Sequence, residues 1–173
     1  MIMERGKPLL SPVDPSFIWM SLFVALVVNM LIGLGNYFWT PDLLAMTLVF
    51  WSVHQPRRVG IGSAFVFGLM MDVHESALLG QNALAYTLLC FGAISIHRRL
   101  LWFPVQQQSI QVLPLFALTA LAEWLTRLFA GQAFFSWGLL LAPLIQALLW
   151  PVISTLLLIP QRRDRSSSDH RTL

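Results

Sequence analysis

Basic residues occur in every second connection between the long apolar segments of this 173-residue chain. They precede the first segment, they follow the second and fourth segments as pairs of arginines, and they follow the sixth segment in an arginine-rich tail. The first, third and fifth connections contain no lysine or arginine. Cytoplasmic loops of membrane proteins carry an excess of these residues. The alternation therefore predicts six membrane crossings, with the N- and C-termini both in the cytoplasm.

The composition also indicates a membrane protein, because 57% of the residues are hydrophobic and only 11% are charged. A soluble domain of this length needs more charge to cover its surface. The net charge of +3 does not indicate nucleic-acid binding, since no basic helix face is interleaved with aromatic residues. A single cysteine, Cys90, excludes an intramolecular disulfide. We expect an all-α, multi-pass membrane protein.

The apolar runs predict six transmembrane helices over residues 17–34, 43–53, 60–79, 83–96, 110–129 and 137–159. The second is short, but a re-entrant segment there would place Arg57 and Arg58 outside. Its expected N-cap is Thr40, with Pro41 at the first helical position. The predicted organisation is a cytoplasmic segment, a six-helix transmembrane domain and a disordered cytoplasmic tail, at residues 1–16, 17–160 and 161–173.

Four charged side chains, Asp72, Glu75, Glu123 and Arg127, are predicted to lie at membrane depth in the outer half of the third and fifth helices. Each costs about 2.5–3.5 kcal/mol on insertion scales, so each needs a partner or a function. In one interpretation, Glu123 and Arg127 pair at i, i+4, while Asp72 caps or hydrogen-bonds a neighbouring helix. His74 and Glu75 then reach the outer headgroup region. In the other, all four form a polar cluster that opens to the outer face and binds a partner or a small ligand.

The sequence contains no catalytic motif, and we predict no enzyme activity, no cofactor and no metal site. The arginine pairs are interpreted first as topology determinants and second as lipid or protein contacts. These four residues are Arg57, Arg58, Arg98 and Arg99. Small residues let membrane helices approach closely. The glycines interpreted as helix-packing positions are Gly60, Gly62, Gly68 and Gly80, the last of which also starts a tight turn.

Several motifs within residues 41–104 resemble those of the rod shape-determining protein MreD family. The motifs are Pro41-Asp42-Leu43-Leu44, Trp51, Pro56-Arg57-Arg58-Val59-Gly60, Gly68-Leu69-Met70-Met71-Asp72-Val73 and Leu79-Gly80-Gln81-Asn82-Ala83-Leu84. Members of the family often have a small residue after the aspartate-containing stretch and a histidine in the following turn. This chain instead has His74-Glu75-Ser76 and Asn82 there, which leaves the chemical role of those turn positions open.

The resemblance implies a non-catalytic protein of the bacterial inner membrane that works in the cell-elongation machinery. The partners it implies are an MreC-like membrane protein, the actin-like MreB filament system and the enzymes of lateral wall synthesis, besides membrane lipid. We expect partner helices to pack against the small-residue faces of the third and fourth helices, with Asp72 marking the outer side of the interface. The family's fold is also similar to the substrate-binding components of vitamin transporters. The alternative function is therefore that of a small-molecule (vitamin-like) binding subunit of a membrane transporter.

Overall fold

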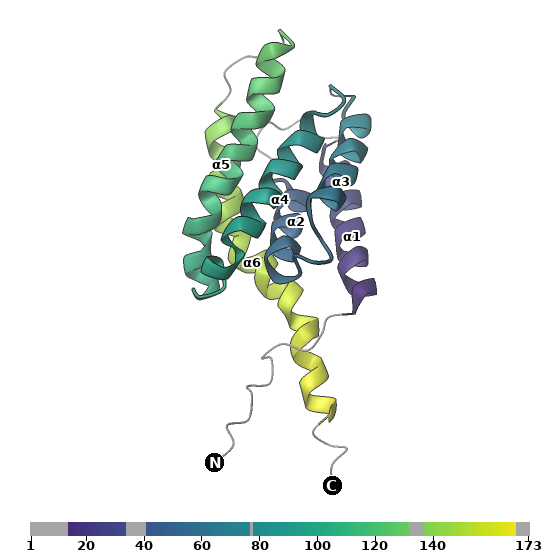
Figure 1. Ribbon diagram of the computed structural model, residues 1–173, viewed down its shortest axis with the longest axis vertical. Coiled ribbons are helices and arrows are strands. Elements are labelled where there is room, and N and C mark those ends of the chain that lie inside the picture. The colour runs from purple at the N-terminus through teal and green to yellow at the C-terminus, as the bar shows by residue number, and fades with distance from the viewer. Residues whose placement is uncertain (1–13, 34–40, 77, 132–136, 169–173) are drawn as a thin grey trace.

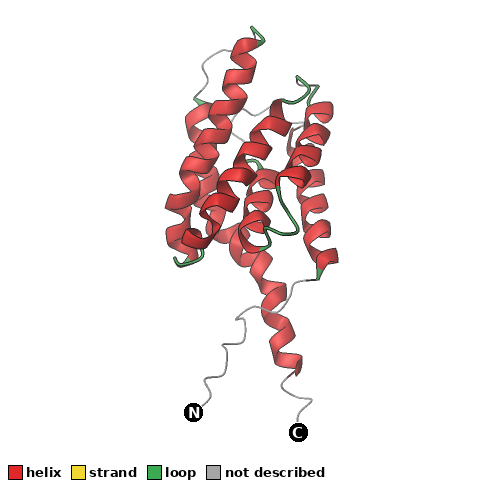
Figure 2. Cartoon of the chain, viewed as in Figure 1, coloured by secondary structure: helices red, strands yellow, loops and turns green. Residues whose placement is uncertain are grey.

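The computed structural model describes residues 14–33, 41–76, 78–131 and 137–168, and within these ranges the chain is helical with short connections (Figures 1 and 2). The six helices are α1 Pro15–Gly33, α2 Leu43–His54, α3 Ile61–His74, α4 Gln81–Leu100, α5 Val105–Phe129 and α6 Gly138–Ser168. The all-helical class is therefore confirmed. Three of the helices contain segments long and apolar enough to cross a membrane: Pro15–Gly33, Val105–Phe129 and Leu140–Ile159.

The helices form an elongated bundle in which successive connections alternate between its two ends (Figure 1). We call the end with the α2–α3 and α4–α5 connections the arginine end, because Arg57, Arg58, Arg98 and Arg99 lie there. The opposite end contains the α3–α4 turn, residues 75–80, and we call it the turn end. Helix α1 begins and helix α6 ends at the arginine end. Both arginine pairs therefore lie at the same end of the bundle as the start of the first helix and the end of the last.

Helix α2 is the central helix of the bundle. Every residue from Leu44 to Val53 is buried, and α1, α4 and α6 all pack against it. With 12 residues it is about 18 Å long, well short of a hydrocarbon core of about 30 Å. Backbone that stops within the membrane is tolerated only where protein covers it. The N-terminus of α2 therefore lies inside the bundle, enclosed by its neighbours.

Helices α3 and α4 are in closest contact at Gly68. A Cβ on Gly68 would lie 2.4 Å from the Cα of Ala83 and 2.7 Å from the carbonyl oxygen of Asn82, so only glycine fits without movement. A Cβ on Gly92, a residue that the sequence analysis did not single out, would lie 2.6 Å from Leu115 Cδ2 on α5. Gly68 on α3 and Gly92 on α4 are thus used for packing within the bundle. The sequence analysis expected partner helices to pack against the small-residue faces of these two helices. At Gly68 and Gly92 that space is instead taken by neighbouring helices of the same chain.

The other glycines interpreted as packing positions have different surroundings. A Cβ on Gly62 would meet nothing within 4 Å, and one on Gly60 would lie 3.7 Å from the carbonyl oxygen of Pro56. Gly80 has φ +100° at the N-cap of α4 and open space around its Cα. Its role is to supply a left-handed backbone conformation, which L-residues rarely adopt. Close approach between helices is therefore seen at Gly68 and not at these three positions.

Two helix starts differ from the sequence expectation. The N-cap of α2 is Asp42, whose Oδ1 accepts a hydrogen bond from the backbone N–H of Ala45 at 2.8 Å. The expected cap, Thr40, lies outside the described residues, and Pro41 precedes the helix. Helix α5 begins at Val105 and not near residue 110, because the polar residue Gln108 is accommodated inside the bundle.

Two helix ends also differ. Helix α3 stops at His74 and not at residue 79. Two residues after His74, Ser76 takes φ 50°, a left-handed conformation typical of helix ends. Helix α6 continues to Ser168, so residues 161–168 of the expected tail are helical. The sequence analysis ended this helix at the last apolar residue, but arginine and serine do not prevent a helix from continuing.

We predict that Gly68→Ala lowers stability by about 1–3 kcal/mol, because the added methyl overpacks the contact between α3 and α4. Gly62→Ala is the matched control, with the same added atom on the same helix in open space. It should leave stability unchanged or raise it by up to about 1 kcal/mol. Thermal unfolding of the two purified variants in detergent tests this. Equal melting temperatures would contradict the assignment of the close contact to Gly68.

Candidate functional site

The carboxylate of Asp72 on α3 caps the N-terminus of α4. It accepts hydrogen bonds from the backbone N–H groups of Gly80 at 2.8 Å, Asn82 at 2.7 Å and Ala83 at 3.4 Å, and its side chain is 1% exposed. The N-cap residue of α4, Gly80, has no side chain with which to cap the helix itself. A helix N-terminus carries unpaired donors and a partial positive charge, and a carboxylate satisfies both. Asp72 thus provides the cap from the neighbouring helix.

A second carboxylate, Asp42, caps α2 and links it to α4. Besides the bond from Ala45, its Oδ2 accepts a hydrogen bond from the hydroxyl of Tyr86 on α4 at 2.5 Å. The backbone N–H of Leu43, the residue after Asp42, donates a hydrogen bond to Oδ1 of Asn29 on α1 at 3.2 Å. The buried N-terminus of α2 is therefore tied by hydrogen bonds to both α1 and α4.

Arg127 on α5 reaches the first turn of α4. When the Gln81 amide presents its oxygen, that oxygen accepts hydrogen bonds from Nε and Nη2 of Arg127 at 3.1 and 3.2 Å. Glu123, one turn earlier on α5, is attracted electrostatically by Arg127 and repelled by Asp42. The expected direct pair of Glu123 and Arg127 is replaced by this arrangement, in which the guanidinium bonds Gln81 and balances the acidic charge around it.

Glu75 completes the group at the turn end. It follows α3, is exposed, and accepts a hydrogen bond from the side-chain amide of Asn82 at 3.1 Å. Glu75 and Asp72 lie near enough to Glu123 on α5 for the like charges to repel one another. All four charged residues singled out from the sequence thus come together. We call these four residues, together with the polar residues that contact them or the N-termini of α2 and α4, the polar cluster. Its members are Asn29, Asp42, Asp72, Glu75, Gln81, Asn82, Tyr86, Glu123 and Arg127.

The sequence analysis did not place Asp42 and Tyr86 in this cluster. With Thr40 as the expected N-cap and Pro41 as the first helical residue, Asp42 would lie in the first turn of the helix. Tyr86 carries no local signal because its partner is distant along the chain. Asn29 did stand out as the one strongly polar side chain in the first apolar run. A polar residue at that depth needs a partner, and this was the available sign that the second helix begins inside the bundle.

The hydrogen bonds of the cluster connect helices to one another. The N-termini of α2 and α4, whose partial positive charge attracts anions in many proteins, already hold the carboxylates of Asp42 and Asp72. Within the described residues, no group of three or more His, Cys, Asp or Glu side chains is placed to hold a metal ion. The arrangement is therefore suited to fixing helix positions inside an apolar environment.

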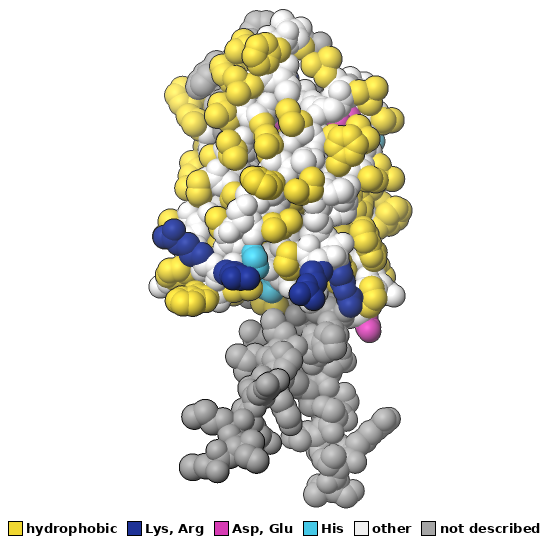
Figure 3. All heavy atoms as spheres, in the orientation of Figure 1, with side chains coloured by type: hydrophobic (Ala, Val, Ile, Leu, Met, Phe, Trp, Pro, Cys, Tyr) yellow, Lys and Arg dark blue, Asp and Glu magenta, His cyan; other side chains and the backbone are white. Residues whose placement is uncertain are grey.

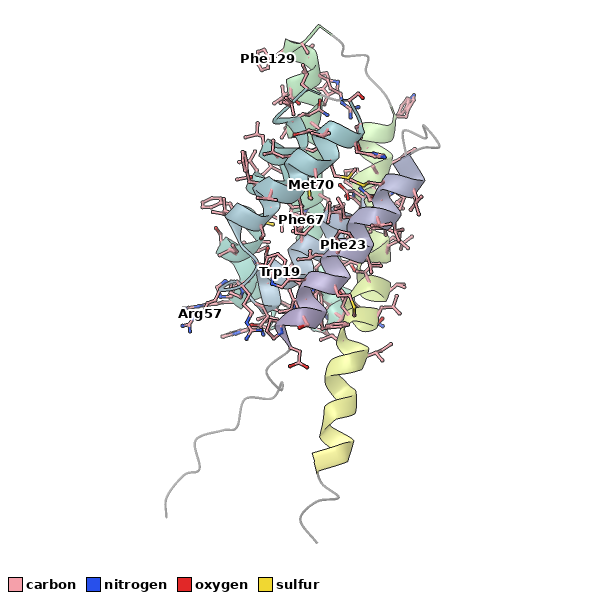
Figure 4. The ribbon with its side chains drawn as sticks, turned by 90° about the vertical axis from the view of Figure 1, so that its right-hand side faces the viewer. Trp19, Phe23, Arg57, Phe67, Met70 and Phe129 are labelled. Carbon is pink, nitrogen blue, oxygen red and sulfur yellow. The ribbon has the colours of Figure 1, made fainter. Side chains whose placement is uncertain are left out.

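The two arginine pairs, Arg57–Arg58 and Arg98–Arg99, lie at the other end of the molecule. Figure 3 shows a band of arginine side chains near the arginine end, and Figure 4 places Arg57 there and Phe129 at the opposite end. Between these ends the outward side chains are mostly apolar, as at Phe23 on α1 and Met70 on α3. An apolar belt with charges separated to its two ends, around carboxylates that are hydrogen-bonded to helix N-termini, is typical of a multi-helix integral membrane protein.

Comparison with known proteins gives the particular family. The family model described as rod shape-determining protein MreD matches residues 13–159. The rod shape-determining protein MreD of Haemophilus influenzae is 28% identical over 121 residues, which cover 68% of this chain and 72% of that relative. No solved structure matches the chain. The chain belongs to the MreD family of membrane proteins involved in rod shape determination, which confirms the resemblance seen in its motifs.

We predict that Asp72→Asn lowers stability by about 1–3 kcal/mol, because an amide cannot accept from all three N–H groups and turns its own donors toward them. Glu75→Gln is the control, since Glu75 is exposed and its one recorded bond comes from a side chain. It should change stability by less than about 0.5 kcal/mol. Thermal unfolding in detergent measures both. A smaller loss for Asp72→Asn than for Glu75→Gln would show that the cap does not stabilise the fold.

A double-mutant cycle on Asp42→Asn and Tyr86→Phe tests the link between α2 and α4. Each single change should cost about 1–3 kcal/mol, and the two together less than their sum. The expected coupling energy is about 0.5–3 kcal/mol. Denaturant or thermal unfolding of the four proteins gives this value. Additive losses would mean that the hydroxyl and the carboxylate stabilise the bundle independently.

Proposed function

We propose that this chain is a non-catalytic scaffold of the bacterial elongation machinery, which crosses the inner membrane six times and binds partner membrane proteins of lateral wall synthesis. Membership of the MreD family supports the role in rod shape. The family is one of shape-determining proteins and is not a known enzyme family.

The proposed topology places the arginine end in the cytoplasm. Both arginine pairs lie at the end where α1 begins and α6 ends, as six alternating crossings with cytoplasmic termini require. Short helix α2 fits this arrangement because its neighbours enclose it. We retain the division into residues 1–16, 17–160 and 161–173, with α6 continuing into the last segment.

The observation that carries the scaffold proposal is that the cluster's carboxylates are engaged with helices of the same chain. Asp72 accepts from three backbone N–H groups, and Asp42 accepts from a backbone N–H and from Tyr86. Groups engaged in this way stabilise a fixed arrangement of helices. A protein built like this presents constant outer faces to other membrane proteins.

The outer faces of α1 and α3 are the proposed contact surface for partner helices, in place of the small-residue face that packs inside the bundle. Trp19 and Phe67 stack with ring centroids 6.5 Å apart, which holds the two helices together at the surface. Figure 4 shows these rings with Phe23 and Met70 along one side of the molecule. The proposed partners are an MreC-like membrane protein, the MreB filament system and the wall-elongation enzymes, as the family resemblance implies.

The alternative, a vitamin-binding transporter subunit, requires an unfilled polar site. Transporters often direct helix N-termini at anionic substrate groups. Here the two N-termini in the cluster hold Asp72 and Asp42. The structure thus offers an anionic ligand no free helix end in this cluster, and we favour the scaffold.

Photocrosslinking in native membranes tests the proposal. A crosslinking residue at the exposed positions Val66 or Met70 on α3 should capture an MreC-like protein or a wall-elongation enzyme. The matched positions Leu118 and Leu121, exposed on α5, should capture less of the same protein. Gentle-detergent isolation of the tagged chain should recover the same partner. Recovery of an ATPase pair with a coupling membrane subunit would instead make the chain a transport component.

A further inference from the structure

The α3–α4 turn presents apolar side chains and a carboxylate close together outside the bundle. Val73, in the last turn of α3, is 69% exposed, Leu79 is 76% exposed, and Leu78 is exposed as well. The carboxylate is that of Glu75, which is also exposed. We call these four residues the turn surface. Its apolar side chains leave an area that another apolar chain can cover.

Carboxyl groups outnumber basic groups around the turn surface. Arg127 is the basic residue at the turn end, and His74 lies beside the turn. The remaining residues of the connections at this end, 34–40, 77 and 132–136, include no histidine and no charged residue. The carboxyl groups are those of Asp42, Asp72, Glu75 and Glu123.

Of these carboxyl groups, Glu75 is the one displayed at the surface of the turn. The single guanidinium of Arg127 bonds Gln81 when that amide presents its oxygen, and its charge acts on Glu123. Asp72 is 1% exposed and accepts from backbone N–H groups. Glu75 instead accepts its recorded hydrogen bond from a neutral side-chain amide. The excess of acid at this end is therefore presented next to the exposed leucines.

A second copy of the chain does not suit this surface. Closed dimers have two-fold symmetry, and between two membrane proteins of the same orientation the axis lies along the membrane normal. The two Glu75 side chains would then lie at the same depth, where like charges disfavour the contact. Lipid chains would cover Leu78 and Leu79 but would give the carboxylate no counter-charge. A segment with both apolar and basic residues meets both requirements.

We propose that the turn surface docks a basic, amphipathic segment of a partner protein, which follows the partner's transmembrane helix on the outer side of the membrane. This rests on the proposed function, which sets the outer side and places the partner helix on α1 and α3. The apolar residues of the segment cover Leu78 and Leu79, and its lysine or arginine lies at Glu75. Because these residues are concentrated on the cytoplasmic side of membrane proteins, a basic outer flank distinguishes the partner from most others.

The experiment uses the full chain in phosphatidylcholine vesicles, with a photocrosslinking residue at Leu79. Three synthetic peptides serve as probes, each with a leucine–alanine helix of about 20 residues that crosses the bilayer. A leucine–serine flank follows the helix and carries two lysines, two glutamines or two glutamates. Capture should fall in that order. The lysine peptide should exceed the glutamine peptide about two- to fivefold, as for an exposed ion pair, and high salt should reduce the difference.

Variants and a second position locate the contact. Glu75→Gln should bring capture of the lysine peptide close to that of the glutamine peptide, and Glu75→Lys should reverse the order of the lysine and glutamate peptides. Asp14→Asn is the matched control, because it removes an exposed carboxylate at the arginine end and should leave the order unchanged. A crosslinking residue at Phe129, exposed at the end of α5, should show no comparable advantage for lysine.

Four results would overturn the proposal. Capture of no peptide at Leu79 would assign the turn surface to lipid, and equal capture of all three at low salt would remove the charge preference. An equal effect of Asp14→Asn and Glu75→Gln would show a response to total charge alone. The fourth is a partner captured from native membranes at Val66 or Met70 whose outer flank contains no lysine or arginine. That result would leave the scaffold function standing, whereas capture of no membrane protein there would count against the scaffold itself.

Discussion

The Asp72 carboxylate at the N-terminus of α4 is the interaction on which the rest of the bundle depends. Its three N–H partners would otherwise be unpaired in a buried position, and a buried donor left without a partner costs about 1–3 kcal/mol. The bond forms only because Gly68, one turn before Asp72, lets α3 lie directly against Ala83. A larger residue there would push α4 away from the carboxylate. The close packing at Gly68 and the capping by Asp72 therefore depend on each other. Because Gly68 has no side chain, the N-terminus of α4 comes within hydrogen-bond distance of the Asp72 carboxylate.

The same principle explains how a helix as short as α2 can occupy the centre. A helix that starts inside the membrane leaves its first N–H groups without water, so each must find a partner in the protein. Asp42 and Asn29 provide those partners, and Tyr86 fixes Asp42 from α4. Arg127 then supplies a positive charge among four acids, which limits their mutual repulsion. Position and charge in the cluster are set jointly by residues from α1 to α5.

Local patterns in the sequence predicted the membrane class, the number of helices and the α3–α4 hairpin. They also raised the capping of a neighbouring helix as one role of Asp72. What they could not supply was helix rotation. Gly62 and Gly68 look equivalent in the sequence, yet only Gly68 faces α4. The Asp42–Tyr86 contact joins residues 44 positions apart, so neither periodicity nor charge pattern indicates it. Early termination of α3 was missed because the apolar residues Leu78 and Leu79 follow the polar break at Ser76.

A cluster that stabilises the fold changes how loss of rod shape should be interpreted in variants of this family. Substitution of Asp72 removes a cap before it can affect any partner, and a loss of about 1–2 kcal/mol can lower abundance several-fold in cells. A shape defect from such a variant therefore reports first on the amount of folded protein. Substitutions on the outer face, as at Met70, remove no internal hydrogen bond recorded in the structure. A shape defect at unchanged abundance from that face would support the proposed contact with another membrane protein, and this separates the role in rod shape from the stability that supports it.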